Sequence, residues 1–178
     1  MSLFGYFIVA RHVRPLPELP SIERLCRESV DGIRAGTVGG LHSDGDWQFL
    51  QVLDGAGLDV ADLVAETGAP ALSVYVIESA VGVVGGAAPG GDEWYGCLNP
   101  ADAVRAFDMP SELAGSVEQT TGYAVRWAES AGRTADPVAV AAAVDGGVGP
   151  FGEGVRSFVD GLGFRFGFVT AEMGRKTS

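Results

Sequence analysis

Positively charged residues and asparagine are scarce in this chain of 178 residues. Lysine occurs only at position 176 and asparagine only at position 99, whereas glycine occurs 27 times. This usage is typical of GC-rich coding sequence, so we expect a bacterial source and assign part of the glycine content to codon composition. Arginine supplies almost all of the positive charge in a chain whose formal net charge is −11.

Cysteine is equally scarce, and long apolar runs are absent. Cys26 and Cys97 belong to no Cys-x-x-Cys or mixed Cys/His pattern, so the sequence predicts neither a disulfide framework nor a zinc site. The opening run LFGYFIVA lacks the basic region and the cleavage site of a signal peptide. No run reaches the ~20 apolar residues that a membrane helix needs. We therefore expect a soluble protein of the reducing cytoplasm.

A hydrophobic content of 47% excludes a disordered chain and predicts a packed core. Most of the predicted strands lie in the N-terminal half, where β-branched and aromatic runs alternate with glycine and proline. The runs GYFIVAR and ALSVYVIES are apolar on both sides, as expected for strands that are covered on both faces. The predicted strands are residues 5–11, 46–54, 71–79, 80–86 and 93–98, with residues 164–170 as a candidate final strand.

Helices are predicted mainly in the C-terminal half. Capping residues begin them at Ser21, Asp59, Asn99, Ser111 and Asp136. The first of these helices is expected to end near Gly36, the second at Gly68, and the fourth near Ala131, and a last helix is expected from Phe151 to Leu162. The pattern predicts an α+β fold in a single domain, with a mixed sheet of about five to six strands from the first half of the chain.

Residues 42–47, HSDGDW, place His42, Asp44 and Asp46 at alternate positions, which an extended chain would direct to one side. Oxygen and imidazole groups arranged in this way are one type of metal site. Gly45 falls between the two aspartates, however, so the segment does not match a calcium-binding loop. We therefore interpret the segment as a polar turn that leads into a strand, and we predict neither a metal ion nor a cofactor.

Other motifs give little sign of catalysis. The run VGVVGGAAPGG is rich in glycine but lacks the Lys-Ser/Thr ending of a phosphate loop, so a hairpin is the simpler interpretation. His12 and His42 are the only histidines, which leaves few bases for nucleophilic catalysis. Arg11 and Arg14 concentrate positive charge at the end of the first predicted strand. They are a candidate anion site, but a solvated strand end is the interpretation that we prefer.

The strongest pattern is the distribution of charge along the chain. Residues 35–104 contain ten acidic residues and no lysine or arginine, so −10 of the net charge of −11 lies in this segment. Asp59, Asp62 and Glu66 are spaced to form one stripe on a helix, although the scarcity of lysine could by itself produce such a stripe. A negative field repels phosphate backbones and anionic membranes, so binding of nucleic acid or of a membrane surface is not expected. The same field attracts a basic protein.

Two functions are compatible with these observations. The one we favour is a non-enzymatic acidic binding module, such as an immunity-type inhibitor, that docks a basic protein partner. The alternative is a small enzyme or small-molecule-binding domain with a pocket between sheet and helices, in which Asp44, Asp46 or Glu78 acts as acid or base. The sequence assigns no catalytic residue. The predicted partner-binding residues, with the two tryptophans as aromatic anchors, are Asp44, Asp46, Trp47, Asp59, Asp62, Glu66, Asp92, Glu93 and Trp94.

Overall fold

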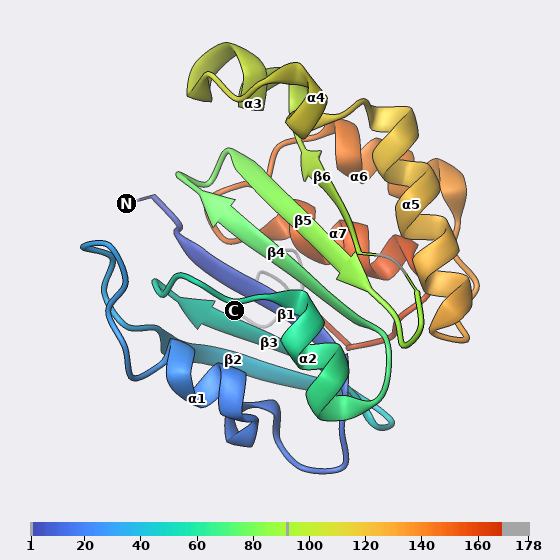
Figure 1. Ribbon diagram of the computed structural model, residues 1–178. Coiled ribbons are helices and arrows are strands. Elements are labelled where there is room, and N and C mark those ends of the chain that lie inside the picture. The colour runs from blue at the N-terminus through green and yellow to red at the C-terminus, as the bar shows by residue number, and fades with distance from the viewer. Residues whose placement is uncertain (1, 92, 169–178) are drawn as a thin grey trace, which may run out of the picture.

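The computed structural model describes residues 2–91 and 93–168, which form a six-stranded sheet with helices on both faces (Figure 1). Every strand pairing is antiparallel, where a mixed sheet was predicted, and the strand order is β2-β3-β1-β4-β5-β6. The predicted α+β class is confirmed. The strands are β1 (Gly5–Arg11), β2 (Thr37–Asp44), β3 (Trp47–Leu53), β4 (Ala71–Ile77), β5 (Val81–Ala87) and β6 (Trp94–Leu98).

One face of the sheet is covered by α5 (Val117–Ser130), α6 (Pro137–Asp145) and α7 (Glu153–Gly161), which lie behind the sheet in Figure 1. Residues of β1, β3 and β4 on this face pack against the three helices and against the segment that follows α7. Burying large apolar side chains such as Phe49 and Phe158 contributes about 1.5–3 kcal/mol each, so this cluster is the main source of stability.

The opposite face is covered in two separate places. The 3₁₀-helix η1 (Leu16–Glu18) and the helices α1 (Pro20–Leu25) and α2 (Val60–Thr67) pack on the side of β3, β1 and β4. The helices α3 (Pro100–Phe107) and α4 (Ser111–Ala114) contact the far end of β5 and β6. Between α2 and α3 no helix crosses the front of β4 and β5 (Figure 1). Part of this sheet face is therefore left accessible.

Several helix boundaries follow from the capping signals in the sequence. The Asp59 carboxylate accepts a hydrogen bond from the Ala61 amide at the start of α2, and Gly68 ends that helix with φ of 69°. The Asp136 carboxylate accepts hydrogen bonds from two amides of α6. Asn99 precedes α3 as predicted, but its side chain makes no capping bond and instead donates to the Ala80 carbonyl.

The first predicted helix is much shorter than expected. It ends at Leu25 rather than near Gly36, and its N-cap position is Leu19 rather than Ser21. The apolar residues Val30 and Ile33, which continued the helical spacing, pair with each other across a tight turn. Asp31 and Gly32 form that turn with positive φ of 50° and 81°, as an Asp-Gly hairpin turn requires. The local turn signal therefore overrides the apolar periodicity.

The strand β2 was not predicted, and the segment HSDGDW contains the end of this strand, the turn and the first residue of β3. Asp44 pairs with Trp47 in the ladder, so Gly45 and Asp46 form a two-residue hairpin loop. Gly45 has φ of 63°, and glycine at the first loop position is characteristic of one of the two favoured hairpin turns. The predicted polar turn is confirmed, but it connects two strands rather than simply leading into one.

Two further predictions need correction. The helix expected from Ser111 to Ala131 is divided at Gly115 into α4 and α5, because Ser116 and Gln119 form a capping box that begins a new helix. The predicted final strand is wrong for residues 164–168, which form no strand, although they pack on the sheet through aromatic rings. The remaining residues of that prediction, 169 and 170, lie outside the described residues.

Candidate functional site

Asp44 and Asp46, the first two predicted contact residues, each form an ion pair with an arginine of the same chain. The Asp44 carboxylate accepts hydrogen bonds from Arg133 Nη1 and from the Arg165 amide, each at 2.9 Å. Asp46 forms a looser ion pair with Arg11, at 3.8 Å between Arg11 Nη2 and the carboxylate oxygen. Asp44 therefore ties the β2–β3 hairpin to the segment that follows α7.

Trp47 does not form a surface anchor. Its side chain is 6% exposed and packs edge-on against Trp127 and Phe164 in the main core. The prediction that Trp47 presents an aromatic ring to a partner is therefore not supported by its position. Asp46 lies in the hairpin loop, whereas Trp47 is the first residue of β3 and its side chain points into the core.

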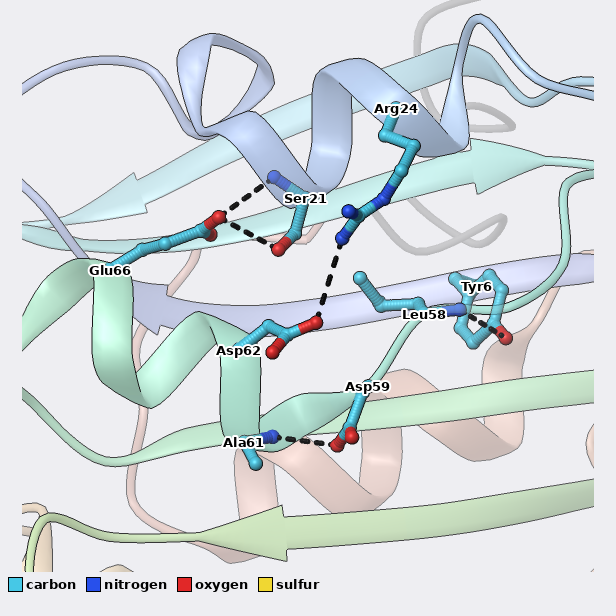
Figure 2. Close-up of polar contacts among 8 residues, drawn as sticks. All are labelled: Tyr6, Ser21, Arg24, Leu58, Asp59, Ala61, Asp62 and Glu66. Carbon is cyan, nitrogen blue, oxygen red and sulfur yellow. Dashed lines mark hydrogen bonds and ion pairs between the residues drawn. The ribbon is translucent and has the colours of Figure 1, made fainter.

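Asp59, Asp62 and Glu66 do form a stripe along α2. Two of them, Asp62 and Glu66, contact side chains of α1 (Figure 2). Glu66 Oε1 accepts hydrogen bonds from the amide and the hydroxyl of Ser21, at 2.9 and 2.8 Å. Asp62 forms an ion pair with Arg24 at 3.5 Å. These contacts hold α1 beside α2, so the acidic spacing in α2 has mainly a structural explanation.

Asp59 caps the N-terminus of α2 and forms no ion pair within residues 2–91 and 93–168. The same holds for Asp54 and Glu93, so these three carboxylates differ from Asp44, Asp46 and Asp62, which form ion pairs with arginines. Asp92, also a predicted contact residue, lies outside the described residues. Glu93 Oε2 accepts a hydrogen bond of 2.7 Å from the Tyr95 hydroxyl.

The three carboxylates surround the part of the sheet that no helix covers. Tyr75 of β4, Val83 of β5 and Tyr95 of β6 lie on this face, and Tyr95 is 56% exposed. Tyr75 also contacts the ring of Tyr6, with 4.8 Å between the ring centroids. We call the surface formed by Tyr75, Val83, Tyr95, Asp54, Asp59 and Glu93 the acidic tyrosine face.

The pKa values of both tyrosines on this face are raised, and the neighbouring carboxylates contribute to each shift. The hydrogen bond to Glu93, partial burial, and the charges of Glu93 and Asp59 together raise the pKa of Tyr95 to about 12. Burial, followed by the charge of Asp54, also raises the pKa of Tyr75. Both phenols are therefore neutral at physiological pH, and each lies close to a carboxylate that has no basic partner in the described part of the chain.

Trp94 points to the other side of the sheet from Tyr95, because neighbouring strand residues alternate. Its ring stacks on Tyr123 of α5, with centroids 5.8 Å apart and an interplanar angle of 17°. The two rings border a hollow of about 310 Å³. We call it the Trp94 hollow, and its lining includes Glu93, Trp94, Tyr123, Arg126, Trp127 and Ser130.

The structure gives little support to the predicted acid–base carboxylates. Glu78 is exposed in the turn between β4 and β5, with φ of 51°, so it is not a buried general acid. His42, Asp44 and Asp46 do not gather, because the His42 ring packs against Phe49 while the aspartates pair with arginines. Among residues 2–91 and 93–168 no group of three or more His, Cys, Asp or Glu side chains is arranged to hold a metal ion.

The suggested anion site at Arg11 and Arg14 stays a prediction. Arg11 and His12 border a hollow of about 370 Å³, but Asp46 lies in the same wall and pairs with Arg11. The carbonyls of His12 and Arg14 accept hydrogen bonds from the Gln48 amide, which fixes this strand end to β3.

Sequence reasoning missed Tyr75, Tyr95, Tyr123 and Arg126. Strand alternation in β6 would have placed Tyr95 on the other face of the sheet from Trp94. Helical spacing places Tyr123 and Arg126 on one side of α5. No helix in the described part of the chain is long and apolar enough to span a membrane. Comparison of the chain with models of protein families, with curated proteins and with solved structures finds no match.

Proposed function

We propose that this protein is a non-enzymatic binding module that docks a basic protein partner on the acidic tyrosine face. The observation that carries the proposal is the gathering of three acids around two tyrosines. Asp54, Asp59 and Glu93, like most acids of the described chain, form no ion pair with arginine, but their charges act on Tyr75 and on the exposed Tyr95. A lysine or arginine of a partner would supply the missing positive charge.

Tyrosine and unpaired carboxylates together suit a basic partner better than either feature alone. Tyrosine is enriched at the energetically dominant positions of protein interfaces, since a rigid ring buries a large area at little entropic cost. A cation over a tyrosine ring gains about 0.5–1 kcal/mol at an exposed site and about 2 kcal/mol or more when water is excluded. The carboxylates would steer a basic protein toward this face and accept its hydrogen bonds. The same field would oppose nucleic acid and anionic lipid.

A titration with defined peptides tests where positive charge binds. Isotope-labelled protein is titrated with nona-arginine, nona-lysine and nona-glutamate while backbone amide shifts are recorded. We expect both basic peptides to shift amides of the acidic tyrosine face more than those near Asp44, Asp62 and Glu66, and nona-glutamate to shift neither. Raising the ionic strength from ~0.05 to ~0.5 M should weaken binding strongly, since the Debye length falls severalfold. Shifts spread evenly over all exposed acids, or centred elsewhere, would contradict the proposal.

A charge-matched pair of variants separates this face from the net charge of the protein. Asp54→Asn with Asp59→Asn removes two charges from the face, and asparagine preserves both the helix cap at 59 and the left-handed backbone at 54, where φ is 59°. The control, Asp136→Asn with Asp145→Asn, removes two charges from α6 on the other side of the sheet. We expect the first pair to weaken nona-arginine binding by about fivefold and the control by less than about twofold. Equal losses would show that only net charge matters.

A further inference from the structure

The Trp94 hollow has mainly apolar walls, and the Trp94 indole nitrogen in one of them is buried without a hydrogen-bond partner in the described residues. The Trp127 indole N–H donates a hydrogen bond of 3.0 Å to the Ala87 carbonyl, so its ring borders the hollow without an unsatisfied donor. The stacked rings of Trp94 and Tyr123 form another wall. Aromatic walls of this kind hold a planar or branched apolar group of a ligand.

The rim of the hollow carries one charge of each sign. Glu93 and Arg126 both line it, and no ion pair within 4 Å joins them or involves either of them in the described residues. The Arg126 guanidinium carbon lies 5.2 Å from the centroid of the Tyr123 ring, which directs it along the wall of the hollow. Glu93 Oε2 accepts a hydrogen bond from the Tyr95 hydroxyl, and Glu93 Oε1 makes no hydrogen bond within the described residues. The hollow thus offers separate partners for an anionic and a cationic group.

We propose that the Trp94 hollow binds a small zwitterion with an apolar side chain, of the type of a free aromatic or branched amino acid. The ligand carboxylate pairs with Arg126, its ammonium group pairs with Glu93, and its side chain packs against the rings of Trp94 and Trp127. A volume of about 310 Å³ is at the lower end for small-molecule sites and suits one such molecule. The Ser130 hydroxyl, which also borders the hollow, donates its proton to the Trp127 carbonyl at 2.6 Å and can accept a hydrogen bond from the ligand.

Three related compounds test the need for both charges. L-phenylalanine carries both, 3-phenylpropanoate only the carboxylate, and 2-phenylethylamine only the ammonium group. Binding is followed by the shifts of the tryptophan indole N–H signals during titration to ~20 mM, which reaches the millimolar dissociation constants typical of such small ligands. We expect L-phenylalanine to bind about tenfold more tightly than either of the other two. Equal binding of all three, or no saturable shift with L-phenylalanine, would overturn the proposal.

Two charge variants assign the partners. Arg126→Gln should remove the advantage of L-phenylalanine over 2-phenylethylamine, and Glu93→Gln should remove its advantage over 3-phenylpropanoate. Arg105→Gln, on the exposed surface of α3, is the control and should change neither ratio. A variant that weakens all three compounds equally would show that the residue shapes the hollow without binding a charge, which would also contradict the assignment.

The inference is separable from the proposed function, although Glu93 contributes to both surfaces. The double variant Asp54→Asn with Asp59→Asn should leave L-phenylalanine binding unchanged. Arg126→Gln should leave nona-arginine binding intact, because Arg126 is not part of the acidic tyrosine face. Loss of peptide binding with retained L-phenylalanine binding would reject only the docking surface, and the reverse result would reject only the Trp94 hollow.

Discussion

Replacing Asp44 by alanine tests whether this carboxylate stabilises the fold rather than a complex. It removes the acceptor of two hydrogen bonds, from Arg133 Nη1 and from the Arg165 amide. A hydrogen bond to a charged group contributes about 1.5–3 kcal/mol, and the side chains of Asp44 and Arg133 are only 23% and 22% exposed. Because water can partly replace the lost carboxylate, we expect a loss of about 2–3 kcal/mol in the free energy of unfolding.

Urea unfolding followed by circular dichroism measures this loss as a shift in midpoint at constant slope. For a chain of this size the same loss lowers the melting temperature by about 4–12 °C. Asp46→Ala is the matched control, since it removes the same charge two residues along the chain. Asp46 belongs to an ion pair with Arg11 in which both side chains are 57% exposed. The control substitution should cost less than about 0.5 kcal/mol.

The comparison has a clear negative outcome. If Asp44→Ala is as mild as Asp46→Ala, the hydrogen bonds of Asp44 do not hold the β2–β3 hairpin against the C-terminal segment. Asp44 would then be as free as Asp54 to bind a partner, and the distinction between Asp44 and the carboxylates of the acidic tyrosine face would fail.

Three further outcomes are expected. Gly96→Ala places a methyl carbon 2.3 Å from Thr120 Oγ1 and should cost about 2 kcal/mol in urea unfolding, much of it recovered when Thr120→Ala is added; no recovery would contradict the packing argument. Ionisation of Tyr95 should leave the free energy of unfolding unchanged below pH 10 and lower it from pH 10 to about 12, because this phenol ionises first in the unfolded chain. Tyr95→Phe should remove that part of the fall, as urea unfolding at high pH would show. Burial raises the pKa of Cys97 to about 11, so iodoacetamide should modify the partly exposed Cys26 in the native protein and Cys97 only after unfolding, as peptide mass spectrometry would show.

The sequence predicted the elements whose signals are local. Asp59 and Gly68 delimit α2, and the apolar run at Gly5–Arg11 forms a strand that is buried on both faces. The strand β2 escaped detection because an edge strand buries little, and Thr37–Asp44 is mostly exposed and interrupted by two glycines. The first helix was extended too far because Val30 and Ile33 fit a helical period that the turn between them breaks.

The candidate site was less predictable because it depends on contacts between distant parts of the chain. The concentration of acids in residues 35–104 is plain in the sequence. Which of them are paired with arginine or hydrogen-bonded is not, since Asp44 is 89 positions from Arg133 and Glu66 is 45 positions from Ser21. Glu93 and Trp94, which the sequence predicted as partner contacts, both line the Trp94 hollow, and the residues opposite them come from α5.

Adjacent glycines of β5 shape both proposed surfaces. A side chain at Gly86 would collide with the Trp94 ring, at 2.3 Å, and one at Gly85 would press on the Tyr95 ring, at 3.1 Å. Each glycine is paired in the ladder with the aromatic residue that covers it. A slip of β6 by a single residue would exchange the two faces, directing the indole outward and the phenol toward α5. The length of the connection between β5 and β6 therefore decides which aromatic ring lies on which face. One residue added or deleted there should abolish both proposed surfaces, although none of their own residues is replaced.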